Sequence, residues 1–234
     1  MTKRWWALTL VPGLVVARAL RVRLTVGPRR RYWATRASQG DHLLVALGDS
    51  LTQGIGSSSP TTSWLALYAA HLESVTGRSV RVENRAVYAA KIADLIATQF
   101  PLPPDATTVV LCIGANDAGR TSPDDFRRRL RIVCAQLPPG SVVGDVPEFQ
   151  WGGRVEAAAE LAQVVRDVVA EHPELRLARV ESHTAGTKIF TELAGDFFHP
   201  GDVAYGRIAE AFVEAAVAPR VSAPVDSQQS VPVR

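Results

Sequence analysis

Leu43-Leu44-Val45-Ala46-Leu47-Gly48-Asp49-Ser50-Leu51 is an apolar run that ends in a polar turn carrying a serine. The run stops at Gly48-Asp49, which predicts a buried strand followed by a turn. Several hydrolase folds use such a turn, at the end of a buried strand, to expose a nucleophilic serine. Ser50 is therefore the first candidate for a catalytic residue, and Asp49 is expected to shape the turn by bonding to nearby backbone.

The rest of the chain alternates short apolar runs with longer amphipathic segments. Strands that alternate with helices are typical of a parallel sheet covered by helices on both faces. We therefore predict the α/β class, with three layers (α/β/α) around a central five-stranded parallel sheet. The predicted strands are His42–Leu47, Val80–Glu83, Thr107–Ile113, Ser141–Gly144 and Leu175–Val180, and the predicted helices are Ser63–Thr76, Ala90–Phe100, Pro123–Gln136, Val155–His172 and Gly201–Ala218.

The length and composition fit one folded domain. A chain of 234 residues, 47% of them apolar, can bury one core, because single cores grow to about 250 residues before they split. We predict an N-terminal arm at residues 1–40, a domain at residues 41–218, and a disordered tail at residues 219–234, which is rich in Ser, Pro, Gln and Val.

The basic charge of the chain is concentrated in the arm. Residues 1–40 hold nine Lys and Arg residues and no acidic residue, which leaves 17 basic and 23 acidic residues in the remainder. The predicted domain is thus acidic and has none of the usual nucleic-acid-binding motifs, so no nucleic-acid partner is expected. Cys112 lies in an apolar run, Cys134 lies in a helical pattern, and histidines are sparse, so we expect buried thiols and neither a metal nor a cofactor.

Three alternatives are open for the arm. Its apolar stretch from Trp5 to Ala17 has about 13 residues, too few for a helix that spans a bilayer. It fits an anchor on a membrane surface, with residues 1–36 supplying tryptophans and arginines for the headgroups. It also fits a cleaved signal peptide, with Ala17-Arg18-Ala19 as the cleavage site, or a plain helix packed on the domain. The expected location is membrane-associated or cytoplasmic, with export as an alternative.

The polar residues near the expected sheet edge can carry out acyl transfer. This reaction needs a nucleophile, a base, a group that orients the base, and donors for the oxyanion. His199 can be the base for Ser50, and Asp196 is near enough in sequence to orient the imidazole. The Asn116 side chain and the backbone N–H groups of Ser50 and Ala89 can hold the oxyanion. These residues lie in the segments Gly48–Leu51, Asn84–Ala90, Gly114–Asp117 and Asp196–Pro200.

In these segments the chain resembles the GDSL or SGNH hydrolase family, over roughly residues 43–215. Three of the family's four blocks appear in order, as Gly48-Asp49-Ser50-Leu51, Gly114-Ala115-Asn116-Asp117 and Asp196-Phe197-Phe198-His199. The resemblance implies the flavodoxin-like fold of that family and a serine esterase or lipase. It also implies a triad of Ser50, His199 and Asp196, with Asn116 as an oxyanion donor.

The family's second block departs from its pattern in this chain. The pattern Asn-x-Gly-x-x-Gly is here Asn84-Arg85-Ala86-Val87-Tyr88-Ala89, so both glycines are alanines. Ala89 falls at the family's oxyanion glycine and still offers a backbone N–H. A negative φ would cost this alanine nothing, whereas a positive φ would strain it by about 1 kcal/mol or more. Asn84 and Asp117 are expected to brace their loops.

The sequence leaves the substrate open. The expected partner is a small-molecule or lipid-like carboxylic ester; a thioesterase or a carbohydrate deacetylase is the alternative on the same site. A membrane-tethered binding protein that has lost activity is a further alternative, motivated by the alanines of the second block. Aromatic residues that could line an acyl pocket are Tyr88, Phe149, Trp151 and Phe197, and His183 is the only plausible substitute for His199 as the base.

Overall fold

The computed structural model describes residues 16–38, 40–150 and 152–217. Its strands are β1 (His42–Gly48), β2 (Val80–Asn84), β3 (Thr108–Cys112), β4 (Val142–Gly144) and β5 (Arg176–Ala178). In this part of the chain they form one five-stranded sheet in the order β2-β1-β3-β4-β5, and every pair is parallel. The predicted α/β class with a five-stranded parallel sheet is confirmed.

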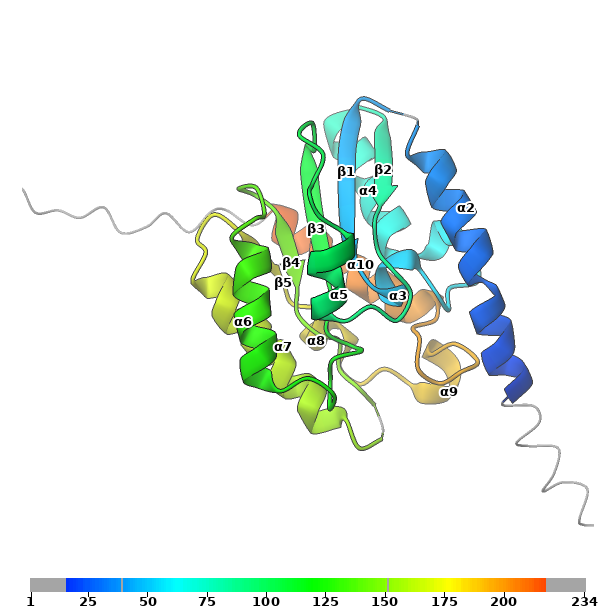
Figure 1. Cartoon of the computed structure of the whole chain (residues 1–234). Helices are drawn as coiled ribbons and strands as arrows, with labels where there is room; N and C mark the ends of the chain where they lie inside the picture. The colour runs from blue at the N-terminus through cyan, green and yellow to red at the C-terminus, as the bar shows by residue number, and fades with distance from the viewer. Residues whose placement is uncertain (1–15, 39, 151, 218–234) are drawn as a thin grey trace, which may run out of the picture.

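Helices cover both faces of this sheet and make it the middle of three layers (Figure 1). Helices α5 (Ile92–Thr98), α6 (Pro123–Cys134) and α7 (Val155–Ala170) lie on one face, and α2 (Val26–Arg36), α4 (Trp64–Thr76) and α10 (Asp202–Val217) lie on the other. Within β1, residues Leu43, Val45 and Leu47 pack on the first face, and Leu44 and Ala46 pack on the second. Successive strand residues point to opposite faces, so a strand buried on both sides needs a continuous apolar run.

The central strands end together at one edge of the sheet. Gly48 at the end of β1 is in register with Cys112 at the end of β3, and Cys112 is in register with Gly144 of β4. The segments that follow these strands therefore start side by side, where open parallel sheets place their binding sites. This register brings Ser50 and Asn116 to neighbouring positions.

Several short elements at this edge are not indicated by the sequence pattern. They are α3 (Ser50–Gln53), the 3₁₀ helix η1 (Pro60–Thr62), α8 (Val180–Thr184) and α9 (Ile189–Glu192). Elements this short leave no periodic signature in the sequence. One of them also corrects a predicted boundary: the strand expected at Leu175–Val180 is limited to Arg176–Ala178, because Val180 begins α8.

The described part of the N-terminal arm is helical and packs on the domain. Residues 16–24 are helical, and α2 follows beside β2 (Figure 1). Trp33 is buried, and its Nε1 donates to the Gln53 carbonyl oxygen at 3.0 Å. Arg29 is also buried, and its Nη2 donates to the Ser57 carbonyl oxygen. Of the three alternatives for the arm, a packed helix therefore describes residues 26–36.

The remaining predictions for the two ends fall on other residues. None of the helices in the described ranges is long and apolar enough to cross a bilayer. Residues 1–15, which hold most of the apolar stretch of the arm, lie outside the described residues, as does the tail predicted at residues 219–234. The division of the chain at residue 40 stays a prediction.

Candidate active site

Ser50 is the first residue of α3, just past the end of β1. Asp49 caps this helix, because its Oδ1 accepts a hydrogen bond from the Leu51 N–H at 2.8 Å. Gly48 makes the turn possible: its φ is 144°, and a Cβ there would lie 2.1 Å from the Cys112 carbonyl oxygen. The local sequence therefore fixes the serine at the end of a central strand.

His199 links Ser50 to Asp196 in one chain of hydrogen bonds. Its Nε2 lies 2.9 Å from Ser50 Oγ, and its Nδ1 lies 2.6 Å from Asp196 Oδ2. The Oδ1 of Asp196 accepts from the backbone N–H groups of Phe198 and His199. Burial raises the pKa of Asp196, but the hydrogen bonds and charge of His199 outweigh it and hold that pKa below its usual value. The carboxylate can thus orient the imidazole with Nε2 toward the serine.

Backbone contacts hold the loop that carries His199. The Ala194 N–H donates to the His199 carbonyl oxygen at 2.8 Å, and Leu193 pairs with Pro200 in an isolated antiparallel bridge. Gly56 lies against this loop: its φ is 102°, and a Cβ there would be 2.7 Å from His199 Cβ. The turn after α3 therefore controls how closely the imidazole approaches that helix, a dependence that no local pattern in the sequence indicates.

Asn116 lies in the turn after β3, and its side chain is held beside the serine turn. Its buried Nδ2 donates to Asp49 Oδ2 and to the Ala90 carbonyl oxygen, both at 3.1 Å. Burial raises the pKa of Asp49 to about 7, against the opposing effect of the Leu51 N–H bond. Both amide hydrogens of Asn116 are engaged, so an oxyanion bound there would share or replace one of these bonds.

Ala89 adopts the conformation in which an alanine is strained. Its φ is 60°, in the left-handed region that costs a non-glycine residue about 1 kcal/mol or more. Among the described residues, neither the Ala89 N–H nor the Ser50 N–H donates a hydrogen bond to the protein. Asn116 bonds to the adjacent Ala90, so this loop lies at the same edge of the sheet. Two free N–H donors are therefore available near the serine.

Replacing Ala89 with glycine should leave the protein equally stable or stabilise it by up to about 1 kcal/mol. Glycine removes the left-handed strain, and its greater freedom in the unfolded chain offsets part of that gain. The free energy of unfolding in urea measures the change. Ala86, whose φ is not positive, provides the matched control: Ala86→Gly should destabilise by about 0.5–1 kcal/mol. Equal destabilisation by the two substitutions would contradict the strain at Ala89.

Gln99 is a residue of this site that sequence reasoning missed. It is fully buried at the end of α5. Its Oε1 accepts from the Gly48 N–H at 2.8 Å, and its Nε2 donates to the Gly48 carbonyl oxygen at 2.7 Å. The two bonds fix the backbone immediately before the serine turn. A single glutamine near a helix end carries no sequence signal of this role.

A cavity of about 420 Å³ with a mainly apolar lining opens at Ser50. A space of this size and polarity suits a small organic substrate. Phe149 and Phe197 line it, as expected for an acyl pocket. Tyr88 is not part of the lining and instead stacks on the imidazole of His199, with ring centroids 6.3 Å apart. Trp151 lies outside the described residues.

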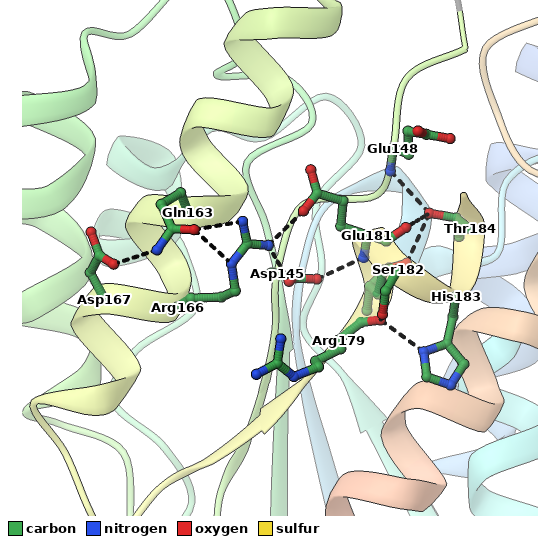
Figure 2. Close-up of polar contacts among 11 residues, drawn as sticks. Asp145, Glu148, Gln163, Arg166, Asp167, Arg179, Glu181, Ser182, His183 and Thr184 are labelled. Carbon is green, nitrogen blue, oxygen red and sulfur yellow. Dashed lines mark hydrogen bonds and ion pairs between the residues drawn. The ribbon is translucent and has the colours of Figure 1, made fainter. Parts of the chain in front are cut away.

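The polar network of Figure 2 supports one wall of this cavity. Arg166 of α7 pairs with Asp145, just after β4, at 2.9 Å and with Glu181 of α8 at 2.6 Å. Asp145 Oδ1 also accepts from the Glu181 N–H at 2.7 Å. In the same region the Glu148 N–H donates to Thr184 Oγ1 at 3.0 Å, and both of these residues line the cavity. The network therefore ties the cavity wall to the end of the sheet.

The other sequence candidates have structural partners elsewhere. His183 lies on α8 with its Nε2 3.2 Å from Glu214, so it is not joined to Ser50. Asn84 donates to a carbonyl oxygen of α3, and Asp117 accepts from the first N–H of α5, so both brace loops as expected. No group of His, Cys, Asp and Glu side chains within the described ranges could hold a metal ion.

Comparisons with known proteins match this chain to one family. The sequence model of the GDSL-like lipase/acylhydrolase family matches residues 46–207. A search of curated proteins finds no significant match.

Solved structures share the fold at low sequence identity. An α/β hydrolase enzyme from the metagenome of Lake Arreo, Spain, is 22% identical with a TM-score of 0.62, over 77% of this chain and 97% of that one. A variant of an acetyl xylan esterase from Geobacillus stearothermophilus is 20% identical with a TM-score of 0.62, over 75% and 94%. A lipase/acylhydrolase from Enterococcus faecalis is 22% identical with a TM-score of 0.61, over 74% and 94%.

Proposed function

The chain belongs to the GDSL-like lipase/acylhydrolase family, and we propose that it hydrolyses carboxylic esters through a covalent acyl-enzyme formed on Ser50. Family membership supports ester hydrolysis in general. The observation that carries the finer proposal is the continuous chain from Ser50 Oγ through His199 to Asp196, with separations of 2.9 and 2.6 Å. These are the distances at which a base can take a proton from a nucleophile while a carboxylate holds the base in position.

The proposed reaction has two halves. His199 Nε2 takes the Ser50 hydroxyl proton as Oγ attacks the ester carbonyl carbon, and the negative charge that develops on the carbonyl oxygen is held by the Ser50 and Ala89 N–H groups and the Asn116 amide. His199 then gives the proton to the leaving alcohol, which leaves an acyl group on Ser50. In the second half, His199 takes a proton from water as the water oxygen attacks the acyl carbon. The bond between Ser50 Oγ and the acyl carbon then breaks, His199 returns the proton to Ser50 Oγ, and the carboxylic acid is released.

A fluorophosphonate probe combined with an ester panel tests this proposal. The probe should react with Ser50, and peptide mapping should find it there alone. A panel of alkyl esters, a thioester and an acetylated sugar separates an esterase from a thioesterase or a deacetylase by the ratio of their kcat/KM values. No labelling and no turnover of any panel member would favour the inactive binding protein instead.

The N-terminal helix supplies a second proposal, that it lies on an anionic membrane surface. Val16, Leu20 and Leu24 are 58%, 54% and 74% exposed, and their spacing of four puts them on one face of the helix. Arg18 of the same helix packs against Gly195, beside the loop that carries His199. An apolar face flanked by arginines fits anionic lipid headgroups. The arginines of this segment are Arg18, Arg21 and Arg23.

Co-sedimentation of the full chain with lipid vesicles tests the second proposal. We expect binding to vesicles that contain phosphatidylglycerol, weaker binding to phosphatidylcholine alone, and a loss of binding in Leu24→Glu, because a charge on the apolar face opposes its insertion. Ile132 of α6 is 53% exposed, so Ile132→Glu is a matched control that should bind as the natural chain does. No binding to the anionic vesicles, or equal binding by the two variants, would contradict the proposal.

A further inference from the structure

Arg154 lines the cavity at Ser50 and carries a positive charge that no carboxylate of the described residues pairs with. It is half-buried just before α7. Its Nη1 is buried and has no hydrogen-bond partner among the described residues. None of the ion pairs in that part of the chain includes Arg154. A buried nitrogen of a guanidinium that lacks a hydrogen-bond partner is costly.

Two aromatic rings and a glycine hold the Arg154 side chain in one direction. Its Cζ lies 5.5 Å from the ring centroids of both Phe149 and Phe198. Its aliphatic stem packs against Gly119, where a Cβ would be only 3.1 Å from Arg154 Cγ. Cation–π contacts stabilise the charge and leave the guanidinium edge, with its N–H donors, free for a ligand. The donors are therefore positioned before a ligand arrives, which lowers the entropy lost on binding.

Phe198 links the Arg154 guanidinium to the imidazole of His199. The Phe198 ring contacts the His199 ring edge to face, with centroids 5.1 Å apart. The same Phe198 ring also contacts the guanidinium of Arg154. One aromatic ring thus separates the guanidinium from the imidazole that bonds Ser50. Ser50 and Arg154 line the same cavity, so a substrate with its ester at Ser50 can extend toward Arg154.

The carboxylates that line the same cavity are already engaged. Asp196 accepts from His199, and Asp49 accepts from backbone and amide donors. Glu148 Oε2 accepts from the Gln150 side chain at 2.7 Å and from the N–H of Gly186 at 2.8 Å.

The two carboxylates behind the cavity wall are not available either. Asp145 and Glu181 both pair with Arg166 (Figure 2). Burial lowers the pKa of Arg154, and the positive charge of Arg120 lowers it further. Among the described residues, no carboxylate of the cavity or its wall is therefore left to pair with Arg154.

We propose that Arg154 determines specificity by binding an anionic group, a carboxylate or a phosphate, carried by the ester substrate. This inference rests on the proposed ester hydrolysis at Ser50. A planar guanidinium binds such groups through two parallel N–H bonds, which a lysine ammonium does not reproduce. The site would therefore select esters of acidic compounds over neutral esters of the same length.

Two matched substrate pairs test the proposal, one with the anion on each side of the ester. Monomethyl glutarate is compared with methyl pentanoate for an acyl-side anion, and para-acetoxybenzoate with para-acetoxybenzamide for an alcohol-side anion. The anion preference is the ratio of kcat/KM for the acidic ester to that for its neutral partner. Arg154→Met, which keeps the apolar stem, should lower this ratio by about 10- to 100-fold for at least one pair, and Arg154→Lys should lower it less.

Controls separate this role from others. Arg120→Met removes the same charge from an exposed neighbour and should leave the ratio unchanged within about twofold, because exposed charges are screened. If Arg154→Met lowers kcat/KM equally for the acidic and the neutral ester, Arg154 has a structural role. If Arg120→Met lowers the ratio as much as Arg154→Met does, the effect comes from the general electrostatic field. Either result overturns the proposal. So does a ratio that Arg154→Met leaves unchanged for both substrate pairs, although ester hydrolysis itself would then stand.

A binding measurement covers the case of poor turnover of these four esters. Free glutarate should slow the reaction of a fluorophosphonate with Ser50 in the natural chain and should not slow it in Arg154→Met. Equal protection in the two proteins, or none in either, contradicts the anion site. If the fluorophosphonate does not label Ser50 in the natural chain, that result contradicts the proposed ester hydrolysis itself, on which the anion site rests.

Discussion

Replacing Ser50 with alanine should lower kcat/KM for ester hydrolysis by on the order of 10⁴-fold or more. The substitution removes the only oxygen in the hydrogen-bond chain that can form the acyl-enzyme, while His199 and Asp196 stay in place. Reaction with the fluorophosphonate probe should be lost together with turnover. The measurement is steady-state hydrolysis of the best ester of the panel, with thermal unfolding recorded on the same protein samples.

A second buried serine, Ser141, provides a matched control for Ser50→Ala. Ser141 is as buried as Ser50, and its Oγ donates to the Pro138 carbonyl oxygen at 2.6 Å at the start of β4. Ser141→Ala should cost stability through that lost bond, by about 1 kcal/mol, and retain activity. If Ser50→Ala hydrolyses the ester at the natural rate, Ser50 is not the nucleophile. If Ser141→Ala is equally inactive, the loss reflects folding and not chemistry.

Replacing Asp196 with asparagine should lower kcat by about 10⁴-fold, as the same change does in other triads. Asp196 accepts from His199 Nδ1 at 2.6 Å, so it selects the tautomer whose Nε2 can take the serine proton. An asparagine amide can donate to Nδ1 and hold the opposite tautomer, which leaves Nε2 protonated and unable to act as the base. Hydrolysis rates for the two proteins measure the effect.

The same substitution has a stability signature whose sign follows from the pKa of Asp196. That pKa lies below its usual value in the folded protein, so the carboxylate stabilises the fold above the unfolded-state pKa of about 4, and this contribution is lost as pH falls through the folded-state value. The natural chain should therefore be more stable than Asp196→Asn at neutral pH, and the difference should shrink in acid.

Asp125→Asn, at an exposed ion pair in the first turn of α6, serves as the control and should keep full activity. A difference in stability that grows on acidification, or an active Asp196→Asn, would contradict the role of Asp196.

The strands and the larger helices could be predicted from the sequence because their signal is local. The continuous apolar run of β1 requires burial on both faces, and the helices on each side supply it. Boundaries differ where a short element begins at once, as α8 does at Val180. The helices near the serine are too short for periodicity to reveal them.

The candidate site residues could be predicted for a related reason. Ser50 and Asn116 follow neighbouring strands, so the register of β1 with β3 is enough to bring their turns together. His199 and Asp196 are three residues apart in one loop, so their contact is local as well. The structure joins His199 to Ser50 across the fold, and no pattern in the sequence specified that distance.

Contacts between loops that are distant in sequence leave no periodic pattern in the sequence. They could be identified only from the tertiary structure. The φ of 60° at Ala89 could not be inferred, because the identity of a residue does not fix its backbone angle. Gln99 holds Gly48 across the sheet edge, and Arg154 is clamped by Phe149 and Phe198. The chain's own pattern therefore fixed the parallel sheet and the serine at its edge, since strand period and turn chemistry act over a few residues. The shape and charge of the cavity were determined by long-range packing, because they depend on how loops distant in sequence pack against one another.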